Sequence, residues 1–186
     1  MIIDGPQLWP AFFRREPTLA LAIPRRGHTS AGAKDLTEPL EPEIIQLNVQ
    51  RAGMEKIRLR AALTAGLSDA CQLVIAWPVG SEERHFDGPD YYECLRAFRR
   101  VIEPDGFRVL CQGARPNVCP SAMASEMGGA MKSYVLTLGL PAFTKDLVGT
   151  FDPVEDIASV GTLQEQDEFM RRHWEEFKKR ARSIGK

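Results

Sequence analysis

Several features that would reveal a function are missing or scarce in this chain of 186 residues. Lys and Arg together number 24 against 25 for Asp and Glu. The chain therefore lacks the excess of positive charge that is typical of a nucleic-acid-binding protein. No apolar run approaches the roughly 20 residues that a membrane-spanning helix needs. Hydrophobic residues make up 44% of the chain, too large a share for a disordered protein. These absences leave a soluble globular protein with one buried core.

Metal-binding patterns are also absent. The chain has four cysteines, at Cys71, Cys94, Cys111 and Cys119. They include no C-x-x-C pair and have no nearby histidine, so we expect no structural metal site. The start of the chain carries Asp4 where a signal peptide has a base, and no long apolar segment follows. We therefore expect a cytoplasmic protein with buried thiols, of which Cys119, in a predicted loop, is the candidate for a reactive one.

Motifs of the common enzyme classes do not occur. There is no G-x-S-x-G elbow, no Walker A sequence and no G-x-G-x-x-G after a predicted strand. The pair Gly128-Gly129 follows a predicted helix, where glycine ends a helix and does not cradle a phosphate. His85 and Asp87 could form a His–carboxylate pair, but no nucleophile signature accompanies them. The sequence therefore favours a non-catalytic protein that needs no cofactor.

The first 42 residues differ in composition from the rest. They hold six prolines, which break helices because each removes a backbone donor: Pro6, Pro10, Pro17, Pro24, Pro39 and Pro42. We predict an irregular, proline-rich arm over residues 1–42, followed by a single α/β domain over 43–186.

From residue 43 the apolar pattern predicts helices that alternate with strands. The predicted helices cover 43–65, 90–102, 120–127 and 162–184, and the predicted strands cover 72–77, 107–111 and 133–138. Phe98 and Trp174 lie in the middle of apolar helix faces, so we predict both as core residues. On the same basis Arg96 and Arg99 fall on the solvent side of their helix. The alternation predicts a two-layer or three-layer α/β sandwich with a short, mainly parallel sheet and amphipathic helices.

A polar segment predicted as a loop, residues 78–89, is rich in acidic residues. The predicted partner-binding residues lie in it and directly after it: Glu82, Glu83, Asp87 and Asp90. Clustered carboxylates steer the approach of a basic partner. This segment favours a protein partner, such as a basic toxin domain, over nucleic acid or a membrane.

A second segment suggests a different function. The loop that follows the predicted strand 107–111 precedes a helix, which is where open α/β sheets bind ligands. Its candidate ligand-binding residues are Arg115, Asn117, Ser121 and, at the start of the next strand, Lys132. They offer a planar cation, an amide, a hydroxyl and an ammonium group to an anion. The alternative hypothesis is therefore an enzyme or sensor that binds a small anion or nucleotide, although caps and turns use the same residue types.

The chain also resembles a protein family. The stretch from Gly113 to Met123, the Met-Gly-Gly that ends at Gly129, the Tyr-Val-Leu from Tyr134 and the Thr-Leu-Gln-Glu-Gln from Thr162 carry the likeness. They are similar to a pattern in small bacterial immunity proteins of toxin–immunity systems. The resemblance covers residues 90–180 and includes no functional motif. It implies an immunity or inhibitor protein that neutralises a cognate bacterial toxin.

Overall fold

The first two strands form a hairpin where the sequence predicted one long helix. The computed structural model describes residues 41–65 and 70–184. In it, β1 (Glu43–Arg51) and β2 (Ile57–Ala65) run antiparallel, and Gly53 in their turn has the left-handed φ of +76° that favours glycine. Leu47 and Val49 are buried between more exposed neighbours, which is the period of two of a half-buried strand. The helix predicted at 43–65 is wrong.

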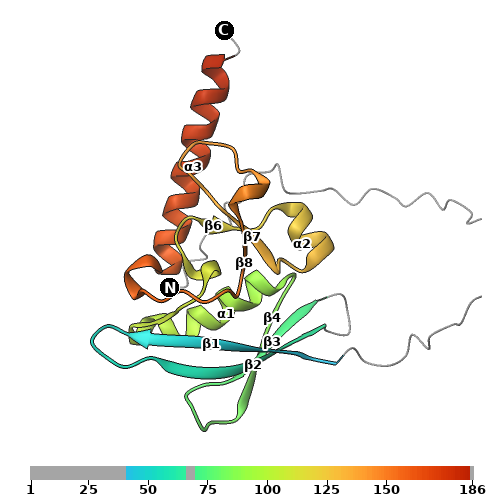
Figure 1. Cartoon of the computed structure of the whole chain (residues 1–186), viewed down its shortest axis with the longest axis vertical. Helices are drawn as coiled ribbons and strands as arrows, with labels where there is room; N and C mark the ends of the chain where they lie inside the picture. The colour runs from blue at the N-terminus through green and yellow to red at the C-terminus, as the bar shows by residue number, and fades with distance from the viewer. Residues whose placement is uncertain (1–40, 66–69, 185–186) are drawn as a thin grey trace, which may run out of the picture. The chain divides into compact units, whose positions relative to one another are not determined.

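In the described part of the chain, five strands form the main sheet in the order β4-β3-β2-β1-β5 (Figure 1). The other three are β3 (Cys71–Ala76), β4 (Glu83–Gly88) and β5 (Phe107–Val109). All neighbouring pairs are antiparallel, and the sheet curls into a half-barrel. The mainly parallel sheet that we predicted is therefore wrong. The turns between β1 and β2 and between β3 and β4 are too short for a parallel crossover, which takes about a dozen residues or more.

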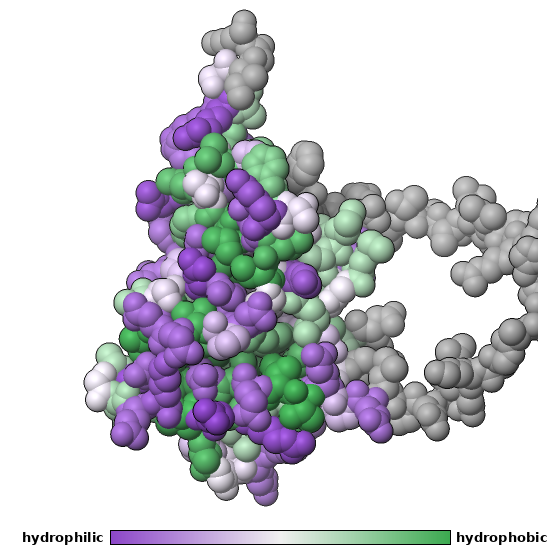
Figure 2. Space-filling model, in the orientation of Figure 1, coloured by the Kyte–Doolittle hydropathy of each residue, from purple (hydrophilic) through white to green (hydrophobic). Residues whose placement is uncertain are grey.

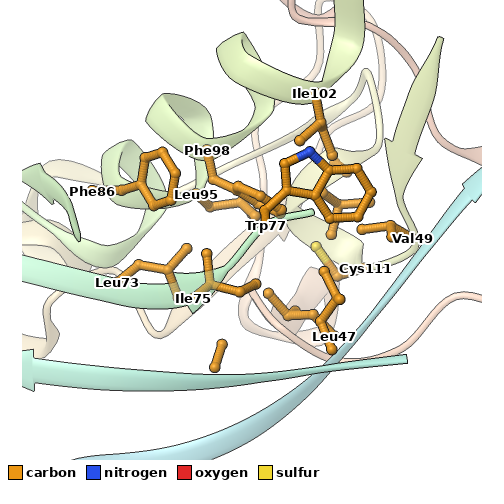
Figure 3. Packing of buried hydrophobic residues seen from close by; sticks show 14 of the residues in the cluster. Leu47, Val49, Leu73, Ile75, Trp77, Phe86, Leu95, Phe98, Ile102 and Cys111 are labelled. Atoms are coloured by element: carbon orange, nitrogen blue, oxygen red, sulfur yellow. The ribbon is translucent and has the colours of Figure 1, made fainter. Parts of the chain in front are cut away.

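One helix covers the inner face of this sheet. Helix α1 (Tyr91–Ile102) begins at Asp90, whose Oδ1 accepts a hydrogen bond from the Glu93 N–H at 2.8 Å. Leu95, Phe98 and Ile102 on its buried side pack against the inner residues of β1, β3 and β4 (Figure 3). The helix predicted at 90–102 and the core position of Phe98 are confirmed.

A smaller sheet holds the strand that we predicted at 133–138. Its order is β6-β7-β8, with β6 (Val118–Cys119), β7 (Lys132–Val135) and β8 (Leu147–Gly149). Helix α2 (Ala122–Gly128) connects β6 to β7. Both pairs in this sheet are antiparallel, so β7 does not lie beside β5 in a common sheet as predicted.

The chain closes with a long helix, α3 (Leu163–Ile184), in which Trp174 is half-buried. A capping box begins this helix: the Glu165 N–H donates to Thr162 Oγ1 at 3.0 Å, and the Thr162 N–H donates to Glu165 Oε2 at 2.7 Å. Short 3-10 turns stand at η2 (Glu103–Asp105), η3 (Gln112–Ala114), η4 (Thr144–Asp146) and η5 (Ile157–Ser159). None of the described helices is both long enough and apolar enough to cross a membrane. Except for its last two residues, the predicted arm 1–42 lies outside the described residues.

Candidate functional site

The outer face of the main sheet, opposite α1, carries the best candidate for a binding site. Because side chains alternate along a strand, the residues next to the buried Leu59 and Ala61 point to this outer face. β2 presents Arg58 and Arg60 there, and both are exposed. Figure 2 shows hydrophilic side chains around separate hydrophobic areas over the visible surface.

A shallow hollow of about 200 Å³ lies on this outer face. Small apolar side chains from three neighbouring strands line it: Ile44, Ala62, Val74 and Ala76. The connection from β3 to β4 adds Val79 and Gly80. Ile44 and Val79 are 44% and 64% exposed, so the hollow offers apolar surface to solvent. Exposed apolar surface rimmed by polar residues is typical of an interaction site.

Charges of opposite sign stand on the two sides of the hollow. Arg58 and Arg60 line it from β2, and Glu83 lines it from β4. The two arginines are two positions apart on one strand, which separates their Cα atoms by roughly 7 Å. Neither side chain makes a hydrogen bond or an ion pair to another residue in the part of the chain that the structure describes. No described residue therefore occupies either guanidinium group.

A hydrogen-bonded group extends the polar rim along β4. Gln72 Nε2 donates to Asp87 Oδ1 at 2.7 Å, and His85 Nδ1 lies 2.8 Å from Gln72 Oε1. Because an amide oxygen only accepts, His85 Nδ1 is the donor in this contact. The predicted pair of His85 and Asp87 is thus joined through Gln72 and not directly.

The four predicted partner-binding residues occupy three different settings. Glu83 and Asp87 are exposed on β4, because residues 83–88 form a strand and not the loop that we predicted. Glu82 is exposed at the end of the connecting turn. Asp90 is only 5% exposed and caps α1, so it is a structural residue and not part of the surface.

The alternative ligand site consists of residues with local structural contacts. Arg115 Nη1 donates to Gln112 Oε1 at 3.0 Å, and Asn117 Nδ2 donates to the Leu136 carbonyl at 3.0 Å. Ser121 caps α2, and Lys132 is exposed at the start of β7. Among the described residues, no hydrogen bond or ion pair joins Arg115, Asn117, Ser121 or Lys132 to one another, and the buried Nε of Arg115 has no hydrogen-bond partner.

A buried polar cluster, formed by Arg99, Glu103 and Gln166, contacts the backbone of this loop. The sequence analysis did not predict it. Gln166 Nε2 donates to the carbonyls of Gly113, Arg115 and Val118 at 3.1, 2.8 and 3.1 Å. Arg99 is fully buried, and its Nε donates to Glu103 Oε1 at 2.7 Å. The solvent position predicted for Arg99 is wrong. The cluster stabilises the loop in one conformation by filling the hydrogen-bonding capacity of its carbonyl groups.

The cysteines are poor candidates for catalysis. All four are free thiols. Burial raises the pKa of Cys94 and of Cys119 to about 12, and the pKa of Cys111 to about 11. At neutral pH these groups stay protonated, and the thiol is a weak nucleophile and metal ligand. Within residues 41–65 and 70–184, no three His, Cys, Asp or Glu side chains are placed to hold a metal ion.

In comparisons with known proteins, no family model and no curated protein matches the chain.

Proposed function

We propose that this chain is a non-catalytic protein that binds a protein partner through the outer face of its main sheet. Its concrete role is that of an immunity or inhibitor protein against a bacterial toxin domain. One observation carries the proposal: an exposed apolar hollow lies between Glu83 of β4 and two arginines, Arg58 and Arg60, whose side chains have no partner among the described residues.

The size of the hollow favours a protein partner over a small molecule. Small-molecule pockets enclose roughly 300–1,000 Å³ and bury most of their ligand. This hollow has about 200 Å³ and is lined partly by exposed residues, so it accommodates a side chain of a larger partner. An apolar centre that receives one anchoring side chain, with charges around it, is the arrangement of a protein–protein interface.

The charges around the hollow specify the partner further. Glu82, Glu83 and Asp87 attract a basic region, and such complementarity raises the rate of association. Arg58 and Arg60 on the opposite side pair with acidic groups of the same partner. A partner that is uniformly basic or uniformly acidic is repelled on one side of the hollow. Charges of both signs around the hollow therefore give specificity.

The immunity role rests on the resemblance over residues 90–180 in combination with this surface. An immunity protein works by forming a tight complex with its toxin and needs no catalytic group of its own. The candidate partner to test is therefore a toxin domain encoded next to this protein.

Binding to the neighbouring toxin domain tests the proposal. We expect the full chain to bind the purified domain in calorimetry and to restore growth of cells that express it. Ala76→Trp fills the hollow and should weaken binding at least roughly tenfold, which corresponds to about 1.4 kcal/mol. Ala181→Trp, on an exposed turn of α3, is the matched control and should bind as the unmodified chain does.

Two results contradict the proposal. If the unmodified chain neither binds the toxin domain nor protects cells, the immunity role is wrong. If Ala76→Trp folds and binds as well as Ala181→Trp, the partner does not use the outer sheet face.

A further inference from the structure

The two edges of the main sheet differ in how their backbone groups are occupied. At one edge, β5 has only three residues, and the chain beyond it continues into a bridge between Cys111 and Pro153. The Val154 N–H also donates to the Leu110 carbonyl at 3.1 Å. This edge strand is short, and the chain's own backbone pairs with the two residues that follow it.

The opposite edge, β4, has no strand paired to its outer side among residues 41–65 and 70–184. It has six residues, Glu83–Gly88, and pairs on one side with β3. Apart from this ladder, no backbone group of Glu83–Gly88 forms a hydrogen bond to the backbone of another described residue. Every second residue of a strand directs its N–H and C=O groups to the same edge, so β4 presents a row of donors and acceptors that no described residue occupies.

We infer that the partner adds a strand to the free edge of β4, and that this strand is an extended basic segment. This inference rests on the proposed function, because it names the way in which the partner is held. In strand addition the backbone hydrogen bonds give affinity, and the side chains on alternate positions give specificity.

The side chains of β4 define the chemistry of the added strand. Glu83, His85 and Asp87 are exposed on its outer face, and the two acids are four positions apart. A residue directly opposite on an antiparallel strand points to the same face, with its Cβ about 4.5–5.5 Å away. A segment with Lys or Arg at two positions four apart therefore places one base against Glu83 and one against Asp87.

The geometry also links this edge to the hollow. An added strand lies about 4.7–4.9 Å from β4, on the side away from β3. Glu83 belongs both to the edge strand and to the rim of the hollow. A partner whose extended segment pairs with β4 can thus place a neighbouring side chain over Val79 and into the hollow.

Backbone methylation of a peptide distinguishes strand addition from simple charge attraction. The probe is acetyl-Thr-Lys-Val-Thr-Val-Lys-Thr-amide, whose two lysines are four positions apart. Two derivatives carry N-methyl groups on alternate residues, one on the odd set of amides and one on the even set. Only one set faces β4, so we expect one derivative to bind the full chain at least roughly tenfold more weakly, because several hydrogen bonds are lost. The other should bind like the parent peptide.

A pair of charge reversals tests the position on the sheet. Glu83→Lys with Asp87→Lys should weaken binding of the parent peptide roughly tenfold, since two attractive cross-strand pairs become repulsive. Asp105→Lys with Glu126→Lys changes the net charge equally at exposed sites elsewhere and should leave binding nearly unchanged.

Three results overturn the inference: no binding of the parent peptide, equal binding of both methylated derivatives, or a dimer of the chain alone that Glu83→Lys with Asp87→Lys dissociates. The last result assigns the edge to a second copy. A toxin domain that binds the chain but not Ala76→Trp, together with equal binding of both derivatives, retains the proposed function and removes strand addition. If the chain does not bind the toxin domain but binds the two derivatives with different affinities, strand addition is retained and the immunity role is wrong.

Discussion

Arg99 and Gln166 form the buried contact that ties α1 to α3: Nη1 of Arg99 lies 2.8 Å from Oε1 of Gln166. Both side chains are fully buried, and the same oxygen accepts a second hydrogen bond, from Arg96 Nη1 at 3.1 Å. Burial of a guanidinium group is costly unless hydrogen bonds compensate for the lost water. The side chain of Gln166 therefore forms hydrogen bonds with two arginines and with three carbonyl groups of the loop.

Gln166→Leu should destabilise the protein by about 2–4 kcal/mol, because it leaves buried donors of Arg99 and carbonyls of the loop without partners. Urea unfolding followed by circular dichroism measures the loss. Gln164→Leu, at an exposed position on the same helix, should change the free energy of unfolding by less than about 0.5 kcal/mol. Equal stability of the two variants would show that the cluster contributes little.

Phe98→Ala should cost about 3–5 kcal/mol, as truncation of a buried aromatic residue does. Phe98 is 0% exposed, and its ring centroid lies 5.3 Å from that of Phe86 and 6.1 Å from that of Trp77. Phe143→Ala is the control, because Phe143 is 57% exposed and should lose under about 1 kcal/mol. A loss below that value at Phe98 would contradict the core assignment.

The sequence predicted elements with strong local signals and failed where pairing depends on distant residues. Asp90 and Thr162 mark the starts of α1 and α3 in the sequence itself, because a capping side chain acts within three residues of its own position. The segment 43–65 contained a conflicting signal. Leu47 and Val49, followed by Leu59, Ala61 and Leu63, alternate as strands do, but Ile45, Val49 and Ala52 also fit a helical spacing. Because residues 43–65 were predicted as one helix, the predicted fold lacked β1 and β2, and the remaining strands were assigned to a parallel sheet.

The candidate site was predictable only in part, for a related reason. Glu83 and Asp87 stood out by their charge, and both are exposed, whereas the similar Asp90 became a buried cap. Arg58 and Arg60 gave no signal, since they join the site only when β2 lies between β1 and β3. The buried Arg99 also gave none, because a charged residue is normally assigned to the surface. The contact with Gln166 spans 67 positions, which no local pattern detects.

His173 makes the stability of the protein depend on pH. It is 3% exposed, its ring stacks on Phe169 and Phe177, and its Nδ1 accepts a hydrogen bond from the Gly139 N–H at 3.2 Å. Desolvation lowers the pKa of this imidazole below its ordinary value, and a hydrogen bond with the backbone of Thr137 opposes the shift in part. The folded state therefore holds His173 neutral.

The sign of the effect follows from proton uptake. As the pH falls below about 6.5, the unfolded chain binds the proton at this residue before the folded protein does. The stabilisation by neutral His173 is thus complete above about pH 6.5 and is lost as the pH falls through the lower folded pKa. His173→Gln keeps an acceptor for Gly139 without a titrating group, so its free energy of unfolding should fall less between about pH 7.5 and 5. His85→Gln, at an exposed site, is the control; the same pH profile in the His173 variant and the unmodified chain would refute this assignment.

A comparison of variants at β4 and at Arg115 separates binding of a protein partner from binding of a small anion. Reversal of Glu82, Glu83 and Asp87 to Lys should leave folding nearly intact, because exposed substitutions change stability by under about 0.5 kcal/mol each. It should slow association with a basic toxin domain in stopped-flow measurements and flatten the salt dependence of the rate, because steering by these carboxylates is removed. Arg115→Ala should leave this association unchanged, since Arg115 contacts Gln112 within its own loop and lies on neither β4 nor the hollow. If the triple reversal has no effect on the association rate while Arg115→Ala abolishes binding of a small anion such as inorganic phosphate, the protein works through a ligand site, and the acidic strand only keeps an exposed sheet edge from aggregating.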